Sequence, residues 1–418
     1  MKKAIYIILI LFSFSSFAQI DSLRKYYKAG MTSYERADYQ SFLTNMQKAD
    51  SFRAFYPPII YNIAAGYALT GNEKKAAHYL KIFLTFNSVA DFQTDSDFQS
   101  IKSSDAFQSL ITLQNQLSQE ISKSQISNTI SGVNHIEAIA INETNGDLFL
   151  GDVWDRKVYK SSNEDGLQTL LDFKDYPDLY SVMGLDFDEK SKTLWICSAA
   201  LPQTQGFEKS LEGSSSIFSI DLRKNSVHHH GTFTSKNTFG DLIVSKKGVV
   251  YVSDGASNTI YWLDRKNQLS VFADLSQSTY NLQGLALSED ESTMFISDYA
   301  LGIIKLDMKS KQSVSLSFEK GIPFKGIDGL YYQNEKLFAI QNGAKPIRIV
   351  QLHLNQNQTR VIDYKILDQN MKYLNEPTQG FLRKDRFIYL SNSAWAAYDD
   401  SNQFTEAAPA QLREVKIE

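Results

Sequence analysis

The sequence predicts two folded parts, an N-terminal domain of helical repeats and a C-terminal six-bladed β-propeller. Apolar and small residues recur at the helical period up to about residue 113. From Ser131 onward they alternate along short segments that are bounded by turn residues. The alternating part contains six similar units whose starts lie roughly 48 residues apart, a spacing that suits one four-stranded blade each.

The N-terminal segment, 1–18, has the order of a secretory signal peptide. Lys2 and Lys3 are followed by the apolar run 4–14 and then by the small-residue stretch 15–18. The apolar run is shorter than the ~20 residues that a membrane-spanning helix needs, and a retained membrane anchor is the alternative. We therefore expect this segment to be cleaved and the mature protein to be periplasmic or secreted.

Charge and cysteine content narrow the classes of partner. The 418 residues include 43 basic and 47 acidic side chains, a net charge of −4, and they are interspersed without a stripe of Lys or Arg. This distribution argues against nucleic acid or an anionic membrane as the partner. The single cysteine, Cys197, lies in an apolar run, so it is expected to be a buried strand residue without a disulfide. The partner classes that remain are a small molecule, a glycan and another protein.

Residues 19–113 are expected to be helical, and two runs within them match each other. The matching pairs are Tyr27 with Tyr61, Gly30 with Ala64, and Ala37 with Gly71. All three pairs share one spacing, about 34 residues, which is the period of the tetratricopeptide repeats that the run 61–72 resembles. A third, partial unit follows, and residues 114–124 form a linker. The resemblance implies a peptide-binding groove, whereas the lack of an Asn, Lys or Arg cluster favours a structural cap or spacer.

Residues 125–418 are expected to form the propeller. Each unit opens with an apolar first strand, and a polar turn and a second strand follow it. The units begin at Glu137, Met183, Gly240, Gln283, Asp328 and Gln379. We expect residues 125–131 to close the ring by supplying the outer strand of the last blade. A β-sandwich is the alternative, but it does not explain the constant spacing.

Equivalent first-strand residues of a propeller form a ring around its axis. In this chain the ring contains two carboxylates, Glu137 and Asp328, and the amides of Gln283 and Gln379, with Asp241 adjacent. Carboxylate and amide oxygens are the ligands that hard cations such as Ca²⁺ take. The ring has no Cys or His, which disfavours zinc and copper. The sequence therefore predicts a divalent-metal site, most simply for Ca²⁺.

With these residues, the propeller part resembles the regucalcin/gluconolactonase family. In that family a Glu of the first blade, Asn residues of two middle blades and an Asp of a later blade hold a divalent metal. The resemblance implies that Glu137 and Asp328 are metal ligands, and that Asp328 also acts as base or nucleophile on a lactone. Where the family has Asn, this chain has Gln283, and Gly240 followed by Asp241. The implied ligands are Glu137, Asp241, Gln283 and Asp328.

The resemblance implies metal-assisted hydrolysis of a lactone or a similar ester. Ca²⁺ would polarise the carbonyl, and Asp328 or a metal-bound water would attack. Two alternatives remain open. One is a vestigial ring of satisfied polar groups, and the other is a non-catalytic scaffold whose repeats and propeller hold a protein or glycan.

The histidines have structural interpretations as well as functional ones. His228, His229 and His230 are consecutive residues of an outer strand, so they point alternately to opposite faces and cannot bind one ion together. His135 lies two positions before Glu137 on the same side of a strand. It is either a proton shuttle beside the ring or a satisfied core histidine.

Three further features have expected roles. Asp152, Asp254 and Asp298 end second strands, where short polar side chains cap turns. The insertion 201–214, rich in Gln, Gly, Glu and Ser, is a candidate lid over the channel. The four tryptophans are expected to pack within the blades.

Overall fold

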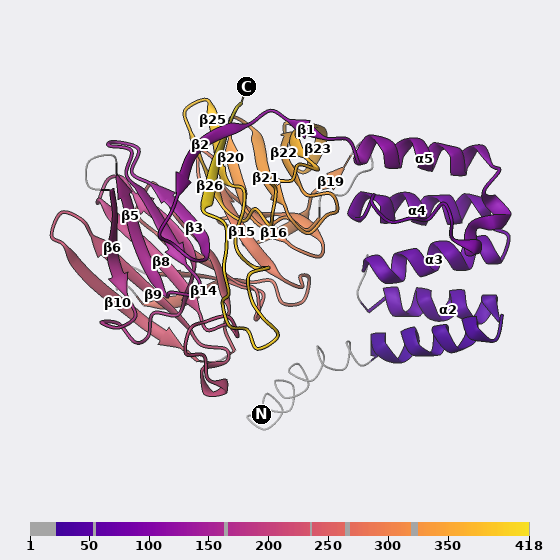
Figure 1. Ribbon diagram of the computed structural model, residues 1–418, viewed down its shortest axis with the longest axis horizontal. Helices are drawn as coiled ribbons and strands as arrows, with labels where there is room; N and C mark the ends of the chain where they lie inside the picture. Colours follow the sequence, from indigo (N-terminus) through magenta and orange to yellow (C-terminus); the bar gives the residue numbers. More distant parts are fainter. Residues whose placement is uncertain are drawn as a thin grey trace. The chain divides into compact units, whose positions relative to one another are not determined.

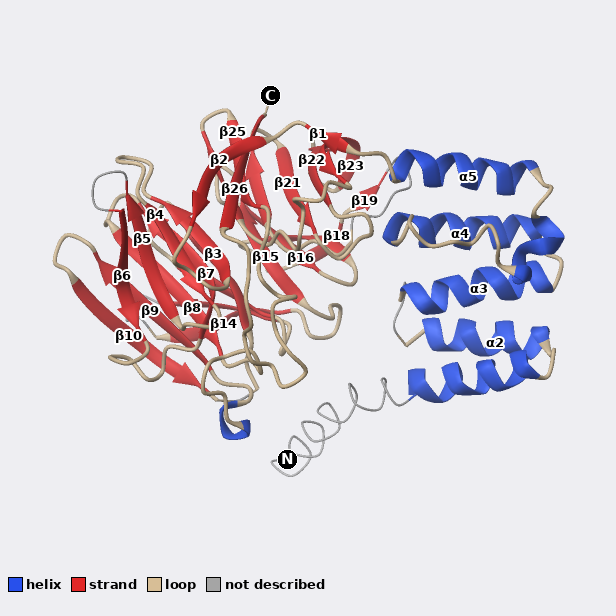
Figure 2. Cartoon of the chain, viewed as in Figure 1, coloured by secondary structure: helices blue, strands red, loops and turns tan. Residues whose placement is uncertain are grey.

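The computed structural model describes residues 22–52, 56–162, 166–234, 236–263, 268–318 and 325–417. The chain divides into two compact units, residues 1–119 and 120–418, and each is described by itself. The first consists of helices and the second almost entirely of strands (Figure 2). The predicted signal peptide, 1–18, lies outside the described residues. In the part of the chain that is described, no helix is long and apolar enough to cross a membrane.

The predicted N-terminal helical domain is confirmed (Figure 1). Its elements are residues 22–35 of the first helix, α2 (Tyr39–Asp50), α3 (Pro57–Leu69), α4 (Glu73–Phe86), the 3₁₀ helix η1 (Ser96–Ile101) and α5 (Asp105–Leu117). Neighbouring helices approach closely: a Cβ added to Gly66 would lie 3.1 Å from Leu43 Cβ. A larger side chain there would push α2 and α3 apart.

Two turns of the same geometry recur at the repeat spacing. Ala37 and Gly71 both have positive φ, at 56° and 80°. The next residue in each turn is an N-cap: Asp38 accepts from the backbone N–H of Ser41, and Asn72 accepts from that of Lys75. The spacing seen in the sequence is therefore a spacing of equivalent backbone conformations.

The predicted six-bladed propeller is confirmed, because the described strands form six sheets. Blade 1 contains β3 (Ile136–Ile141), β4 (Leu148–Asp152), β5 (Lys157–Ser162) and β6 (Gly166–Asp172). Blade 2 contains β7 (Ser181–Asp188), β8 (Thr193–Ala199), β9 (Ser215–Asp221) and β10 (Ser226–Phe233), and the short helix η2 (Lys209–Leu211) lies between β8 and β9. Blade 3 contains β11 (Phe239–Val244), β12 (Val250–Asp254), β13 (Thr259–Leu263) and β14 (Leu269–Asp274).

The remaining blades follow the same order with two additions. Blade 4 contains β15 (Leu282–Leu287), β16 (Thr293–Asp298), β17 (Gly302–Asp307) and β18 (Ser313–Ser315). Blade 5 contains β20 (Leu330–Gln333), β21 (Lys336–Gln341), β22 (Arg348–Leu354) and β23 (Arg360–Gln369), extended by β1 (Ile121–Ser122) and β19 (Ser317–Phe318). Blade 6 contains β24 (Gly380–Arg383), β25 (Arg386–Leu390), β26 (Ala410–Lys416) and β2 (Gln125–Ile130).

The core of the propeller lies between the blades rather than inside any one of them. Clusters of buried apolar residues each join two neighbouring blades, and one of them joins blade 6 to blade 1. The first strands contact one another in the order β3, β7, β11, β15, β20 and β24, and β24 returns to β3. Burial of apolar surface between successive sheets therefore closes them into a ring.

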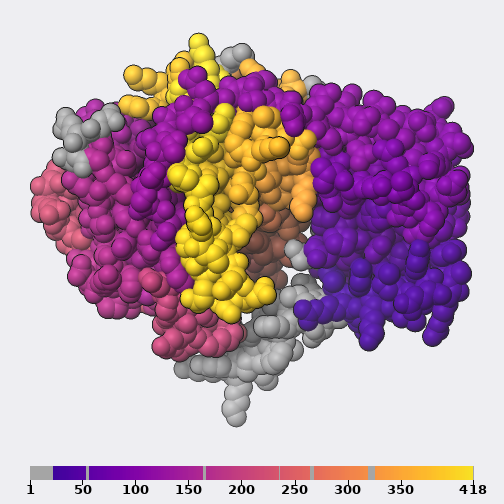
Figure 3. Space-filling model, in the orientation of Figure 1, coloured from indigo at the N-terminus to yellow at the C-terminus, as the bar shows by residue number. Residues whose placement is uncertain are grey.

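The ring is closed by the strand that the sequence predicts. β2 pairs antiparallel with β26, so the start of the propeller completes its last blade. Figure 3 shows the C-terminal residues, in yellow, as a band beside the purple residues that begin the propeller. Just before β2, the backbone N–H groups of Lys123 and Ser124 donate to the buried carboxylate of Asp368, at 2.7 and 3.2 Å. This carboxylate fixes the crossing of the chain from blade 5 to blade 6.

Asp152, Asp254 and Asp298 cap turns, as predicted. Asp298 is typical: Oδ2 accepts from the backbone N–H of Tyr280 and Oδ1 accepts from that of Ala300. Each of the three carboxylates thus ties the end of a second strand to the segment before the first strand. Cys197 is free and buried, as expected.

Candidate functional site

Glu137 and Gln283 are the second residues of the first strands of blades 1 and 4, and Asp328 lies two residues before the first strand of blade 5, β20. The Gln283 amide oxygen lies 3.1 Å from where a Cβ on Gly240 would be, so it points toward blade 3 across space that the glycine leaves open. Its amide nitrogen donates to Asn281 Oδ1 at 3.1 Å. The three residues therefore lie in or directly before first strands that follow one another in a closed ring.

Glu137 is almost completely buried, with 5% of its surface exposed. One oxygen, Oε2, accepts from Ser393 Oγ at 2.7 Å and from the indole Nε1 of Trp395 at 2.9 Å. Both donors belong to residues 391–409, the segment between β25 and β26, which we call the strap. Both bonds end on Oε2, and the Thr378 hydroxyl, which donates to the carbonyl oxygen of Glu137 at 3.0 Å, lies beside the same carboxyl group.

Asp328 is held by a short chain of polar side chains. Asn342 Nδ2 donates to Asp328 Oδ2 at 2.7 Å, and Tyr299 Oη donates to Asn342 Oδ1 at 3.0 Å. The tyrosine bond fixes which end of the Asn342 amide faces the carboxylate. One oxygen of Asp328, Oδ2, is thus engaged by a protein donor.

The two carboxyl groups are electrostatically coupled. Burial, together with the nearby charge of Asp328, raises the pKa of Glu137 to about 8, against the opposing hydrogen bonds from Ser393, Trp395 and Thr378. Burial raises the pKa of Asp328 to about 6, partly offset by Asn342. Two buried carboxyl groups that act on each other favour a bound proton or a bound cation at this end of the channel.

Asp241 differs from its equivalents in the other blades. Its place in the first strand is taken by Ala138, Gly184, Gly284, Gly329 and Gly380 in the other five. Asp241 Oδ1 accepts from the N–H of Leu242 and Oδ2 from that of Leu285 in blade 4, at 2.8 and 3.0 Å. The carboxylate thus bridges blades 3 and 4, and burial raises its pKa to about 8. Both oxygens already have protein partners.

Gln379, the sixth member of the predicted ring, lies just before the first strand of blade 6 and contacts blade 2. Its Nε2 donates to the carbonyl oxygen of Met183 in blade 2 at 2.7 Å. Farther along the strands lies a cavity of about 240 Å³ that residues of all six blades line, among them Asp186 and Tyr331. The Asp186 carboxylate accepts from the N–H of Val244, so it also joins two blades. These polar groups hold first strands together.

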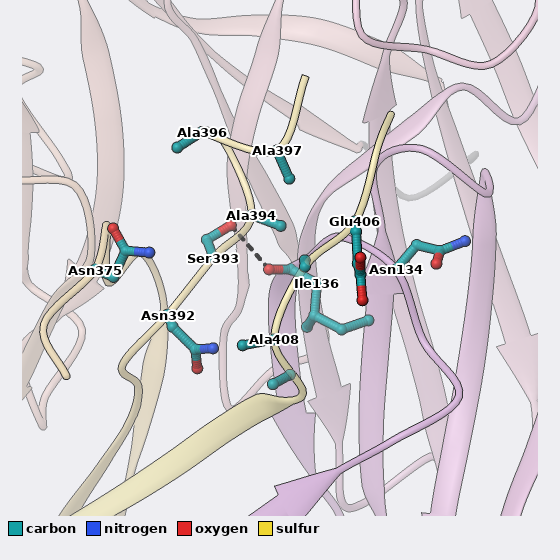
Figure 4. A pocket seen from close by; sticks show the side chains of 12 residues that line it. Asn134, Ile136, Asn375, Asn392, Ser393, Ala394, Ala396, Ala397, Glu406 and Ala408 are labelled. Carbon is teal, nitrogen blue, oxygen red and sulfur yellow. Dashed lines mark hydrogen bonds between the residues drawn. The ribbon is translucent and has the colours of Figure 1, made fainter. Parts of the chain in front are cut away.

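The strap covers the seam between blades 6 and 1. Tyr398 Oη lies 2.7 Å from His135 Nδ1, and Phe404 stacks on Trp154 of blade 1. A pocket of about 180 Å³ lies beside it, lined mostly by residues of the strap, several of them alanines, with Ser393 and Ile136 at its wall (Figure 4). The strap therefore places polar residues of the last blade against the first-blade ring residue.

His135 is a satisfied core histidine. It is fully buried, and its Nε2 lies 2.9 Å from Ser393 Oγ. Burial lowers its pKa to about 3, so the imidazole is neutral near pH 7. The histidine tract is dispersed, as the sequence predicts: His229 stacks on Phe218, whereas His230 packs against Trp195.

The insertion 201–214 is anchored to blades 1 and 2. The Arg156 guanidinium donates to the carbonyl oxygens of Gln205 and Pro177, at 3.1 and 2.7 Å. Thr204 is buried and lies 2.7 Å from the Ser181 hydroxyl. Gln203 Nε2 donates to Asn402 Oδ1, so the insertion also contacts the strap.

The sequence does not reveal Ser393, Trp395 and Asn342, which contact the two carboxylates. All four tryptophans are expected to pack within blades, and Trp195 and Trp262 do so, against His230 and Phe272. For Trp395 this expectation is incomplete, since its indole N–H donates to Glu137. Ser393 and Trp395 lie 256 and 258 residues from Glu137 in the sequence. Their one local signal is the long segment between two strands of the last unit, since long loops often carry functional residues.

Comparisons with known proteins find a likeness of fold. No family model matches the chain, and no curated protein matches it. A gluconolactonase from Xanthomonas campestris is 14% identical with a TM-score of 0.46, and the match covers 72% of this chain and 92% of that chain. The calcium-binding protein regucalcin from Agrobacterium tumefaciens is 13% identical with a TM-score of 0.48, covering 70% and 96%.

A third similar structure is named as a lyase and not as a gluconolactonase. Virginiamycin B lyase from Staphylococcus aureus is 10% identical with a TM-score of 0.47, and the match covers 71% of this chain and 99% of that chain. The likeness to these proteins is one of fold, and it does not select one activity among them.

Proposed function

We propose that the propeller is a divalent-cation-dependent hydrolase of lactones or similar esters, acting at the end of the channel where Glu137, Gln283 and Asp328 lie. The observation that carries the proposal is the coupled pair of buried carboxyl groups from blades 1 and 5. Their charge is not balanced by a nearby Lys or Arg in the described hydrogen bonds. A divalent cation would supply that balance.

The donor set fits a hard cation. Each carboxylate has one oxygen engaged by protein donors, and Gln283 adds a neutral amide oxygen. Among the described residues, no group of three or more His, Cys, Asp and Glu side chains lies close enough to hold a metal. The site would therefore use two carboxylates, one amide and water, a set that suits Ca²⁺ better than zinc. Asp241 is left out, because it already bridges two blades.

In this proposal the chain's own residues position the reactants. The cation, when bound, would polarise the ester carbonyl as a Lewis acid. Asp328, oriented by Asn342, takes a proton from the water that adds to the carbonyl carbon. The ring C–O bond then breaks, and Asp328 returns the proton to the leaving oxygen, which gives a hydroxy acid. Glu137, held through Oε2, keeps Oε1 for the ligand.

Lactone hydrolysis by the full mature chain tests this proposal. Acid release from sugar lactones and simple aliphatic lactones is followed at constant pH with Ca²⁺, Mg²⁺, Mn²⁺ or Zn²⁺, and with a chelator. We expect cation-dependent turnover that Asp328→Asn lowers by ~100-fold or more, since general-base catalysis contributes ~10²–10⁴-fold. Asp274→Asn, at the exposed end of β14, is the matched control and should keep full activity. Equal rates with chelator, or with Asp328→Asn, would refute it.

For the helical unit we infer a different role, that of a tetratricopeptide-like scaffold binding a protein or glycan outside the cell. The equivalent turns at Ala37 and Gly71, with caps at Asp38 and Asn72, support the repeat assignment. The signal-like segment 1–18 supports export. A pull-down from the exported fraction with residues 19–119 deleted tests it, because partners of the scaffold should be lost while lactone turnover remains.

A further inference from the structure

Two side chains of the strap, Tyr398 and Ser393, and His135 of blade 1 form a continuous series of short contacts that ends at Glu137. Tyr398 Oη lies 2.7 Å from His135 Nδ1, and His135 Nε2 lies 2.9 Å from Ser393 Oγ. Ser393 Oγ lies 2.7 Å from Glu137 Oε2 and 2.9 Å from the carbonyl oxygen of Ile136. The series alternates between two blades, because Tyr398 and Ser393 belong to blade 6 and the other residues to blade 1.

The direction of each hydrogen bond follows from the number of hydrogens available. Ser393 has one hydroxyl hydrogen, and the carbonyl of Ile136 and Glu137, when its carboxylate is ionised, can only accept it. His135 Nε2 must therefore donate to Ser393 Oγ. A neutral imidazole has one N–H, so Nδ1 is the acceptor and takes the hydroxyl hydrogen of Tyr398. The donors of Tyr398 and His135 thus point along the series to Ser393, whose one hydrogen is shared between Glu137 Oε2 and the carbonyl oxygen of Ile136.

Trp395 completes the arrangement. Its indole N–H can only donate, and it donates to the same oxygen, Glu137 Oε2, at 2.9 Å. Hydrogen bonds in a chain polarise one another, so the bond on the carboxylate is strengthened by the bonds behind it. The hydrogen bonds from Ser393 and Trp395 both hold Oε2 in place, and in this arrangement Oε1 is left for a ligand.

We propose that Tyr398, His135 and Ser393 are positioning residues that act as one hydrogen-bonded relay, and that with Trp395 they aim Glu137 Oε1 at the ligand. This proposal rests on the function proposed above for the site. It makes the strap a part of the site, because without it the Glu137 carboxylate can rotate. Tyr398 does not touch Glu137, so its influence passes through His135 and Ser393.

Cation affinity of the full mature chain gives the first readout. Titration calorimetry with Ca²⁺ should show ~10-fold or greater weakening for Ser393→Ala and for Tyr398→Phe, since groups that orient metal ligands typically contribute ~10–100-fold in affinity. Ser393→Thr retains the hydroxyl and should restore most of the affinity. Ser401→Ala, on the exposed part of the same strap, is the matched control and should bind as the unaltered protein does.

A second readout needs no cation. The Trp395 indole N–H signal, identified in NMR spectra by its loss in Trp395→Phe, reports on its acceptor, Glu137 Oε2. Tyr398→Phe and Ser393→Ala should both move it, whereas Ser401→Ala should not. If the unaltered protein binds no cation but this signal responds to Tyr398→Phe, the relay stands and the hydrolase proposal fails. If Tyr398→Phe leaves the signal unchanged, the relay is overturned whatever the calorimetry shows.

Discussion

At the scale of single residues, Glu137 makes the folded protein retain a proton that the unfolded chain releases. Its pKa rises from 4.5 to about 8 on folding. Between these values the folded state binds more protons, so the free energy of unfolding falls as pH rises. His135 acts in the opposite direction, but only below its ordinary pKa of 6.5, where the unfolded chain takes up a proton.

The pH dependence of stability above pH 6.5 is the first prediction. In chelator, the unaltered protein should lose stability between pH 6.5 and 8. Glu137→Gln should remove part of that loss, on the order of 1–2 kcal/mol. Denaturant unfolding at several pH values measures both slopes, with Asp274→Asn as the control. Parallel slopes for Glu137→Gln and the unaltered protein would show that Glu137 does not titrate in this way.

Asp241 allows a prediction about structure rather than chemistry. Asp241→Asn replaces one accepting oxygen with a donor, which leaves a backbone N–H of Leu242 or Leu285 without a partner. A buried unpaired N–H costs about 1–3 kcal/mol, so the variant should be destabilised by that amount. Asp274→Asn should change the free energy of unfolding by less than about 0.5 kcal/mol. If the two variants are equally stable, the bridge between blades 3 and 4 is unimportant.

The places of the ring residues in their units were predictable, but their hydrogen-bond partners were not. Glu137, Gln283 and Asp328 each lie at the same position of their own unit, so an alignment of the six units identifies them. The donors to Glu137 come from the opposite end of the propeller sequence, and no local pattern connects them. Asp241 shows the same limit, because only the fold reveals that its oxygens meet backbone N–H groups.

At the scale of elements, the first three strands of the units and the closing strand were predictable from alternation and turn residues. The polar turn 289–292 lies between β15 and β16, and the closing segment 125–131 contains β2. The short strands β1 and β19 were not predictable. They pair only because blade 5 has a long outer strand, β23, whose edge they cover.

Asp368 is the residue on which the crossing between blades 5 and 6 depends. Its carboxylate is fully buried and accepts from two backbone N–H groups, from Tyr373 Oη and from Tyr389 Oη. Asp368→Ala should therefore cost about 3 kcal/mol or more, because several buried donors lose their acceptor. Denaturant unfolding measures the loss, and proteolysis near Lys123 should accelerate. Unchanged stability would mean that β2 is held by its pairing with β26 alone.

At the scale of the whole molecule, the chain consists of two units that divide between residues 119 and 120. A propeller that has its own closed core should fold without the helices. We expect residues 120–418 alone to give the same propeller melting temperature, within about 3 °C, as the longer chain. Calorimetric unfolding of both forms measures this. A fall of about 10 °C or more would show that the propeller depends on the helical unit.

Thermal unfolding of the mature chain with increasing Ca²⁺ tests the central claim most directly. If Glu137, Gln283 and Asp328 hold a cation, the folded state gains about 2.7 kcal/mol at ~100 times the dissociation constant, and the melting temperature rises with concentration. The double variant Glu137→Gln, Asp328→Asn should show no such rise. No rise in the unaltered protein with Ca²⁺, Mg²⁺, Mn²⁺ or Zn²⁺, or an equal rise in the double variant, would contradict the claim.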